Sequence, residues 1–192
     1  SILQGFRAGR WLNGSCTQDY GSVTLMPLCG PLSFVPTSEY RGSLFSHQLE
    51  KASPDYYSVN LERYNIFAEL TGLQRSGIFR FTYKTEGIGH LVIQPNSDES
   101  KGFVEIDPVA QEIRGFNPVH RIYQGSGKFA GFSGFFVIKT SKPFKTFGTF
   151  NNSNLFESQK MISDQRNCGA YVSFLMKENE QLIVKIGTSF TS

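Results

Sequence analysis

Apolar residues recur mostly at every second position in this chain, and that period limits the folds open to it. In "YYSVNLE" the alternating apolar set runs from Tyr57 to Leu61, and in "IFRFTY" it runs from Phe79 to Tyr83. Successive side chains of a β-strand point to opposite faces, so this period predicts strands with one buried face. A helix would need a spacing of three to four residues instead.

Turn residues separate these segments at short intervals. Further predicted strands are Val23–Met26, Ile66–Thr71, His90–Ile93, Phe103–Ile106, Glu112–Phe116, Arg121–Gln124, Phe132–Thr140, Ala170–Met176 and Leu182–Ser189. Many short strands without intervening helices are typical of a sandwich or a barrel. The 19 glycines and 18 phenylalanines suit tight turns and pleated, half-buried surfaces. We expect one all-β domain over residues 1–192, an antiparallel β-sandwich.

Three segments depart from simple alternation. "GFFVIK" and "LIVKIG" are near-continuous apolar runs, which indicates strands buried on both faces. Phe45–Lys51 is predicted to form one short helical turn that ends before Pro54. Residues 150–167 are polar and are expected to form a long loop or a hairpin excursion.

Composition and motifs exclude several function classes. The net charge is only +3 and the Lys and Arg residues are scattered, so neither nucleic acid nor a membrane surface is an expected partner. No apolar run approaches the ~20 residues of a membrane span. Cys16, Cys29 and Cys168 lack metal-type spacing, although one disulfide among them stays open. Phosphate-loop, dinucleotide, zinc-protease and serine-hydrolase motifs are all absent from the sequence.

Histidines and carboxylates give no catalytic pattern of their own. His90 lies within a strand and is read as a partly buried sheet residue. His47 lies in the polar segment "FSHQLEKASPDYY", where a hydrogen bond to a nearby carboxylate and a direct functional role both stay open. Most acids fall in turns and on outer strand positions and are expected to be solvated: Glu62, Asp98, Glu99, Glu105, Asp107, Glu178 and Glu180.

The stretch "GFRAGRWLNGSCTQDYG" (residues 5–21) is the main candidate for a binding loop. Trp11 could offer a flat face to sugar C–H groups, and Arg7 and Arg10 are donor forks suited to hydroxyls or carboxylates. The remaining hydrogen-bonding candidates are Ser15, Gln18 and Asp19. Alternatively, Trp11 plugs one end of the sandwich while Asp19 caps the turn into the next strand.

Four segments together resemble the N-terminal domain of glycoside hydrolase family 92, a family of exo-acting α-mannosidases. The segments are "GFRAGRWLNGSCTQDYGSVTLMP", "SLFSHQLEKASPDYYSVNLERYNIFAELTGLQRSGIFRFTY", "SKPFKTFG" and "LIVKIGTSFTS". They follow the family's order and extend over nearly the whole chain. The block "FSHQLEKASPDYYSV" is the most specific, because His, Glu, Lys and Pro recur there at set spacing.

The resemblance implies an N-terminal β-sandwich followed by a C-terminal (α/α)6 catalytic barrel that this chain lacks. The whole enzyme would release terminal mannose from α-linked mannosides or N-glycans with inversion, and would require Ca2+. Inversion uses two carboxyl groups about 6.5–9.5 Å apart, which would lie in the barrel together with most calcium ligands. No catalytic or metal-binding residue is therefore expected in this chain, and the isolated chain is predicted to be inactive.

The resemblance assigns the chain a supporting part of the sugar pocket. The expected substrate-binding residues are Arg7, Arg10, Trp11, Ser15, Gln18, Asp19 and His47. Many relatives carry a histidine near position 10, so Arg10 leaves the sugar preference open. The expected partners are mannose-containing glycans and the enzyme's own barrel, in a periplasmic, cell-surface or secreted bacterial protein. Two other roles remain, a stand-alone carbohydrate-binding module and a purely structural support for the barrel.

Overall fold

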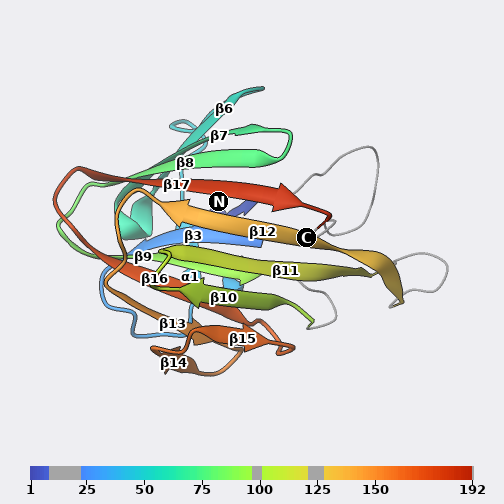
Figure 1. The fold of residues 1–192 in the computed structure, drawn as a ribbon. Coiled ribbons are helices and arrows are strands. Elements are labelled where there is room, and N and C mark those ends of the chain that lie inside the picture. The colour runs from blue at the N-terminus through green and yellow to red at the C-terminus, as the bar shows by residue number, and fades with distance from the viewer. Residues whose placement is uncertain (9–22, 97–100, 121–127, 192) are drawn as a thin grey trace.

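A computed structural model describes residues 1–8, 23–96, 101–120 and 128–191, and these residues form two large antiparallel sheets. The larger sheet contains β5 (Lys51–Ser53), β6 (Tyr56–Leu61), β7 (Ile66–Leu73), β8 (Ser76–Tyr83), β10 (Phe103–Asp107), β11 (Glu112–His120), β12 (Phe129–Thr140), β15 (Met161–Ser163) and β17 (Glu180–Ser189). Its spatial order is β15-β10-β11-β12-β17-β8-β7-β6-β5. Figure 1 shows its central strands side by side in one layer.

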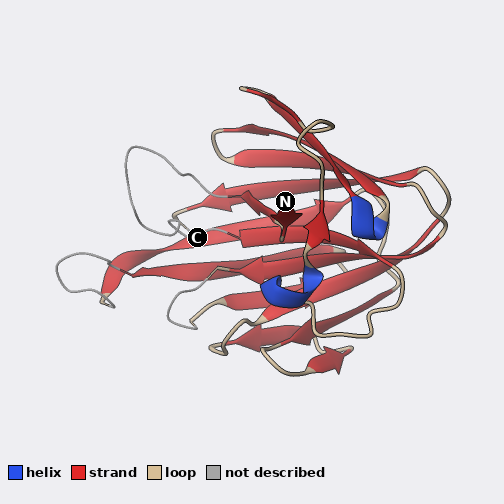
Figure 2. Ribbon diagram, turned by 180° about the vertical axis from the view of Figure 1, so that it is seen from behind, coloured by secondary structure: helices blue, strands red, loops and turns tan. Residues whose placement is uncertain are grey.

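The smaller sheet lies behind that layer. It contains β2 (Phe6–Ala8), β3 (Val23–Cys29), β9 (Gly87–Pro95), β13 (Thr146–Phe150), β14 (Leu155–Glu157) and β16 (Gly169–Met176). Its spatial order is β14-β13-β16-β9-β3-β2. A short pair of strands, β1 (Ile2–Leu3) and β4 (Ser43–Leu44), lies beside it with α1 (Ser38–Arg41) and the 3-10 turn η1 (Glu62–Tyr64). Both helical segments are visible from behind in Figure 2.

One apolar core fills the space between the two sheets. Phe79, Phe81 and Tyr83 of β8 are buried, whereas Arg80 between them is exposed, as the alternation predicts. From the smaller sheet, consecutive buried residues of β9 and β16 join the same core, among them Leu91, Val92 and Val172. The all-β, antiparallel sandwich predicted from the sequence is confirmed. No helix in the described ranges is long and apolar enough to cross a membrane.

Most predicted strands are present and are longer than predicted, because each antiparallel neighbour extends the hydrogen-bonded ladder. Arg121–Gln124 lies outside the described residues. The two apolar runs are not buried on both faces: in β12, Val137 is 39% exposed, and in β17 Lys185 is exposed. The reason is that the larger sheet has only one partner layer, so its other face meets solvent.

The short helical turn predicted at Phe45–Lys51 is not a helix in the structure. The helical turn is not at Phe45–Lys51 but earlier, at α1, where Glu39 in the first turn and Arg41 in the last suit the helix dipole. A hydrogen-bonded turn closes from Leu49 N to Ser46 O (3.1 Å), and β5 then pairs with β6. Strand pairing across the Pro54 turn thus replaces the helix.

The polar excursion 150–167 contains two short strands. β14 pairs with β13 in the smaller sheet, and β15 crosses over to pair with β10 in the larger one. The excursion therefore joins the two sheets at one edge of the sandwich. Of the three cysteines, Cys29 and Cys168 are both free thiols, and Cys16 lies outside the described residues.

At several positions an aromatic ring packs directly against a glycine. Gly115 faces Phe136 on the neighbouring strand, and a Cβ there would lie 2.2 Å from the Phe103 carbonyl oxygen and 2.5 Å from the Phe136 ring. Between the sheets, the Tyr83 ring lies where a Cβ on Gly89 would come within 2.7 Å. The rings use the space that these glycines leave, which is a known way to stabilise glycine in sheets.

Gly115→Ala is expected to lower the free energy of unfolding by about 1–3 kcal/mol, because a backbone carbonyl blocks the added methyl group. The matched control is Gly72→Ala, also in a strand, where the nearest atom would be Ser76 O at 3.4 Å. Urea unfolding followed by far-UV circular dichroism measures both. Equal midpoints for the two variants would contradict the predicted clash.

Candidate functional site

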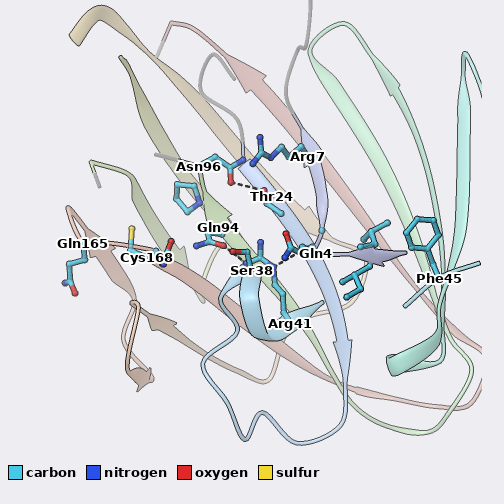
Figure 3. A pocket seen from close by; sticks show the side chains of 15 residues that line it. Gln4, Arg7, Thr24, Ser38, Arg41, Phe45, Gln94, Asn96, Gln165 and Cys168 are labelled. Atoms are coloured by element: carbon cyan, nitrogen blue, oxygen red, sulfur yellow. Dashed lines mark hydrogen bonds between the residues drawn. The ribbon is translucent and has the colours of Figure 1, made fainter. Parts of the chain in front are cut away.

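A polar cavity of about 650 Å3 opens beside the N-terminal segment. Its wall is formed by residues 2–5 and Arg7, by α1, by the ends of β3 and β9, and by the turn before β16, as Figure 3 shows. Its polar side chains are Gln4, Arg7, Thr24, Ser38, Arg41, Gln94, Asn96, Gln165 and Asn167. The apolar part of its wall includes Ile2 and Phe45.

Arg41 is the central side chain of this wall. It is only 3% exposed, although the cavity reaches it. Its Nε donates to Gln4 O (2.6 Å), and its Nη1 donates to Pro36 O (3.2 Å) and to Gln94 Oε1. The Tyr64 hydroxyl donates to the Arg41 carbonyl (2.8 Å). The guanidinium thus ties the N-terminal segment, the loop before α1 and β9 together.

Two other features shape the cavity. The Thr24 hydroxyl donates to Asn96 Oδ1 (2.8 Å), which fixes the end of β9 against β3. Gly5 has φ +150°, and a Cβ there would meet Thr24 Cγ2 at 2.3 Å. Only glycine allows the N-terminal segment to approach β3 so closely.

The cavity is electropositive. Arg7 and Arg41 both line it, and its lining contains no carboxylate among the described residues. Burial lowers the pKa of Arg41 to about 10; the nearby Tyr64 opposes this shift and Arg7 adds to it. Arg41 remains charged at neutral pH, so the cavity holds a buried positive charge.

The structure brings only part of the predicted binding set to this cavity. Arg7 lines it and is exposed. The other loop candidates, Arg10, Trp11, Ser15, Gln18 and Asp19, lie outside the described residues. Residues 9–22 nevertheless connect β2 to β3, and the paired residues Arg7 and Thr24 at these strand ends both belong to the cavity wall.

His47 lies at the rim rather than in the wall. Its Nδ1 is 2.7 Å from Glu50 Oε2, and its Nε2 is 2.8 Å from Ser1 Oγ. Its ring meets the ring of Phe45, which lines the cavity, edge-on at 4.8 Å. The hydrogen bond to a nearby carboxylate that the sequence left open is present.

Glu50 also accepts a hydrogen bond from the Tyr57 hydroxyl (2.6 Å). This bond and that of His47 hold the pKa of Glu50 below its usual range. Burial and the Glu50 carboxylate together raise the pKa of Tyr57 well above its ordinary value. His47, Glu50 and Tyr57 therefore form a connected polar cluster inside the most specific sequence block.

His90 and Glu69 are two buried titratable groups with structural hydrogen bonds. His90 is buried as predicted; it contacts Gly30 O (2.8 Å) and Ser173 Oγ (2.7 Å), and burial lowers its pKa. Glu69, which the sequence did not single out, is buried and accepts two hydrogen bonds from Arg80 (2.6 Å each). Asp98 and Glu99 fall outside the described residues.

The described residues do not fit a calcium site. They contain no group of three or more His, Cys, Asp or Glu side chains that could hold a metal ion. Calcium takes six to eight oxygen ligands, usually with several carboxylates among them. The cavity offers amides and hydroxyls around two arginines, which would repel a cation.

Sequence reasoning missed Arg41, Gln94 and Asn96. Arginine is mostly an exposed residue, so nothing in "SEYRG" marks position 41 as buried. Gln94 lies near the end of β9 and Asn96 directly follows the strand, so two amides close to the apolar run Leu91–Ile93 were the signal that the sequence offered. Their shared location depends on contacts between distant segments.

A sequence profile of the glycosyl hydrolase family 92 N-terminal domain matches residues 1–189. Among solved structures, the family GH92 inverting mannosidase BT2199 from Bacteroides thetaiotaomicron aligns with 100% of this chain at 27% identity and a TM-score of 0.80. The family GH92 α-mannosidase BT3965 from the same organism aligns with 88% at 28% identity and a TM-score of 0.72. The family hydrolase ccman5, at 19% identity and a TM-score of 0.73, shares the fold.

The chain spans about a quarter of the length of these solved relatives, with 25% of BT2199 and 24% of BT3965 covered. No match was found among curated proteins.

Glu50→Gln is expected to lower the pKa of Tyr57, because the negative charge that disfavours the phenolate is removed while its burial remains. The ring carbon shifts of Tyr57 in an NMR titration at high pH measure this. Glu39→Gln is the control, since Glu39 is exposed on α1. An unchanged Tyr57 titration in Glu50→Gln would contradict the role given to this carboxylate.

Proposed function

The chain belongs to the glycosyl hydrolase family 92 N-terminal domain family, and we propose that it is the N-terminal sandwich of an inverting exo-α-mannosidase. The full-length enzyme would hydrolyse terminal mannose from α-mannosides or N-glycans. One observation carries this proposal: a solved inverting mannosidase of this family aligns over the whole chain with a TM-score of 0.80.

The catalytic carboxylates would come from the part of the relatives that this chain does not match. That part accounts for about three quarters of the solved relatives' length, which is ample for a C-terminal barrel. Inverting hydrolysis needs an acid and a base on opposite sides of the bond. The cavity wall supplies neither among its described residues.

Calcium dependence is part of the proposal, with the ion bound outside this chain. The described residues contain no group of three or more His, Cys, Asp or Glu side chains that could hold the ion. Calcium would organise hydroxyl and carboxylate oxygens in the sugar pocket. The proposed location is the periplasm, the cell surface or the exterior, where glycans are degraded.

Residues 9–22 would form the chain's contribution to the sugar pocket. Trp11 would pack against the sugar ring, while Arg10, Ser15, Gln18 and Asp19 would bind hydroxyls. The two ends of this loop lie side by side, because Arg7 of β2 pairs with Thr24 of β3. His47 would act by supporting the rim through Phe45.

An aromatic row on the outer face of the larger sheet supports a further domain as a packing partner. Phe103, Phe116 and Phe135 stand on three neighbouring strands, with ring centroids 5.2 and 5.6 Å apart. β17 brings the chain to this row, because Ser189 pairs with Phe135. The C-terminal part of the relatives would cover these rings and remove them from water.

A stand-alone carbohydrate-binding module is the second candidate function. Such a module needs exposed ring faces, but the Phe103 and Phe116 rings stack on each other at an interplanar angle of 23°. Their faces are thus partly occupied, and the Trp11 loop would have to bind the sugar alone. A third role, mechanical support of the barrel, would leave Trp11 without any contact to the sugar.

The full-length gene product is expected to release mannose from an α-linked mannobiose in the presence of Ca2+ and to lose this activity on chelation. The 192-residue chain alone is expected to release none, because its described residues hold no acid and base pair at the cavity. Mannose release is measured by a coupled enzyme assay at equal protein concentrations. Turnover by the isolated chain would overturn the proposed division of roles.

Trp11→Ala in the full-length protein is expected to lower kcat/KM for the mannoside by about tenfold, the loss of one aromatic contact with the sugar. The control is Tyr40→Ala, which removes an aromatic ring that is 54% exposed on α1. Thermal unfolding separates the alternatives. If Trp11 is purely structural, Trp11→Ala would lower the Tm and leave kcat/KM unchanged. Micromolar to millimolar mannose binding by the isolated chain would instead favour the binding module.

A further inference from the structure

Arg41 carries a buried positive charge and has no negative partner among the described residues. Its three hydrogen bonds all go to neutral acceptors, Gln4 O, Pro36 O and Gln94 Oε1. The ion pairs present among the described residues involve other cations, such as Arg80 and Lys142. Buried arginines are usually paired with carboxylates, because an uncompensated charge in the interior costs several kcal/mol.

Arg41 lines the cavity, and its hydrogen bonds to described residues do not use all of its N–H donors. They use Nε and Nη1, and Nη2 donates to no other described residue. Arginine has five N–H donors in a planar fork, a shape that suits two oxygens of one ligand. Arg7 lines the same cavity and adds a second cation at its open side.

The rest of the lining can donate further hydrogen bonds to an anion. Ser38 can donate a hydroxyl hydrogen bond, and Gln165 can donate from its amide. No carboxylate in the described part of the wall competes for Arg41. The volume of about 650 Å3 is ample for a small anion with its remaining water.

We infer that this cavity is an oxyanion-binding site, in which Arg41 and Arg7 hold a carboxylate or phosphate group. Its ligand class is independent of the proposed mannosidase reaction, whose substrate is neutral. The anion has two possible sources: a free acidic ligand, or a carboxylate side chain of the full-length gene product. Both would neutralise Arg41 by the same contacts.

The test titrates the 192-residue chain with inorganic phosphate and with acetate at constant ionic strength, followed by NMR shifts of Gln94, Ser38 and Arg41. We expect saturable shifts with a Kd in the millimolar range. Methyl α-mannoside, which is neutral, should not compete for this site. Absence of saturable shifts with both anions would overturn the inference.

Two variants test the assigned residues. Arg7→Gln is expected to weaken phosphate binding by about tenfold, the loss of one charge-assisted hydrogen bond. Arg75→Gln, at an exposed turn between β7 and β8, should leave the Kd unchanged. Arg41→Gln should abolish binding; if it fails to fold, the Arg7→Gln and Arg75→Gln comparison still decides, and equal Kd values for these two would contradict the site.

The same titration of the full-length gene product separates the two sources. Binding that persists there indicates a site for a free acidic ligand. Binding seen only in the isolated chain indicates that a carboxylate of the remaining protein fills the cavity. Either result supports the oxyanion site. Mannose release is measured in a separate assay, so failure of the proposed function and failure of the oxyanion site can be distinguished.

Discussion

The ring of Phe6 holds the site's edge of the sandwich together. It lies on β2, at the edge of the smaller sheet, yet it packs against Tyr57, Phe79 and Phe81 of the larger sheet at centroid distances of 6.0–6.4 Å. Because strand side chains alternate, burying Phe6 turns Arg7 outward to the cavity. The position of Gly5 against β3 and the start of the 9–22 loop follow from the same anchor.

Arg41 fixes the segments outside the two large sheets, above all α1. α1 is only four residues long, too short to be stable by itself. Its last residue, Arg41, donates hydrogen bonds to Gln4 and Gln94. These bonds hold the helix in place, a role that side-chain packing has in longer helices. The same contacts place a cation at the cavity wall, and structural support and potential ligand recognition therefore share one side chain.

The sandwich could be predicted because burial of one strand face makes apolar residues alternate in the sequence, most clearly at Phe79, Phe81 and Tyr83. It misplaced the helical turn because the pairing of Lys51–Ser53 with β6 outweighs local helix preference. Arg41 could not be recognised, since its burial depends on Gln4, Pro36 and Gln94, which are brought together only by the fold. The loop around Trp11 was selected for its residue types, and the family resemblance favoured a sugar-facing role over a plugged turn; that role remains a prediction.

Where an aromatic ring packs over a glycine, each of the two residues limits which substitutions the other can accept. Phe136 fits because Gly115 has no side chain, and Tyr171 fits over Gly148 in the same way. A larger residue at the glycine would displace the ring, while a smaller residue at the ring would expose backbone and leave a void. Each pair can therefore change only if both residues are substituted together. We expect such positions to be substituted more slowly than ordinary core positions, where one methyl group can be exchanged for another.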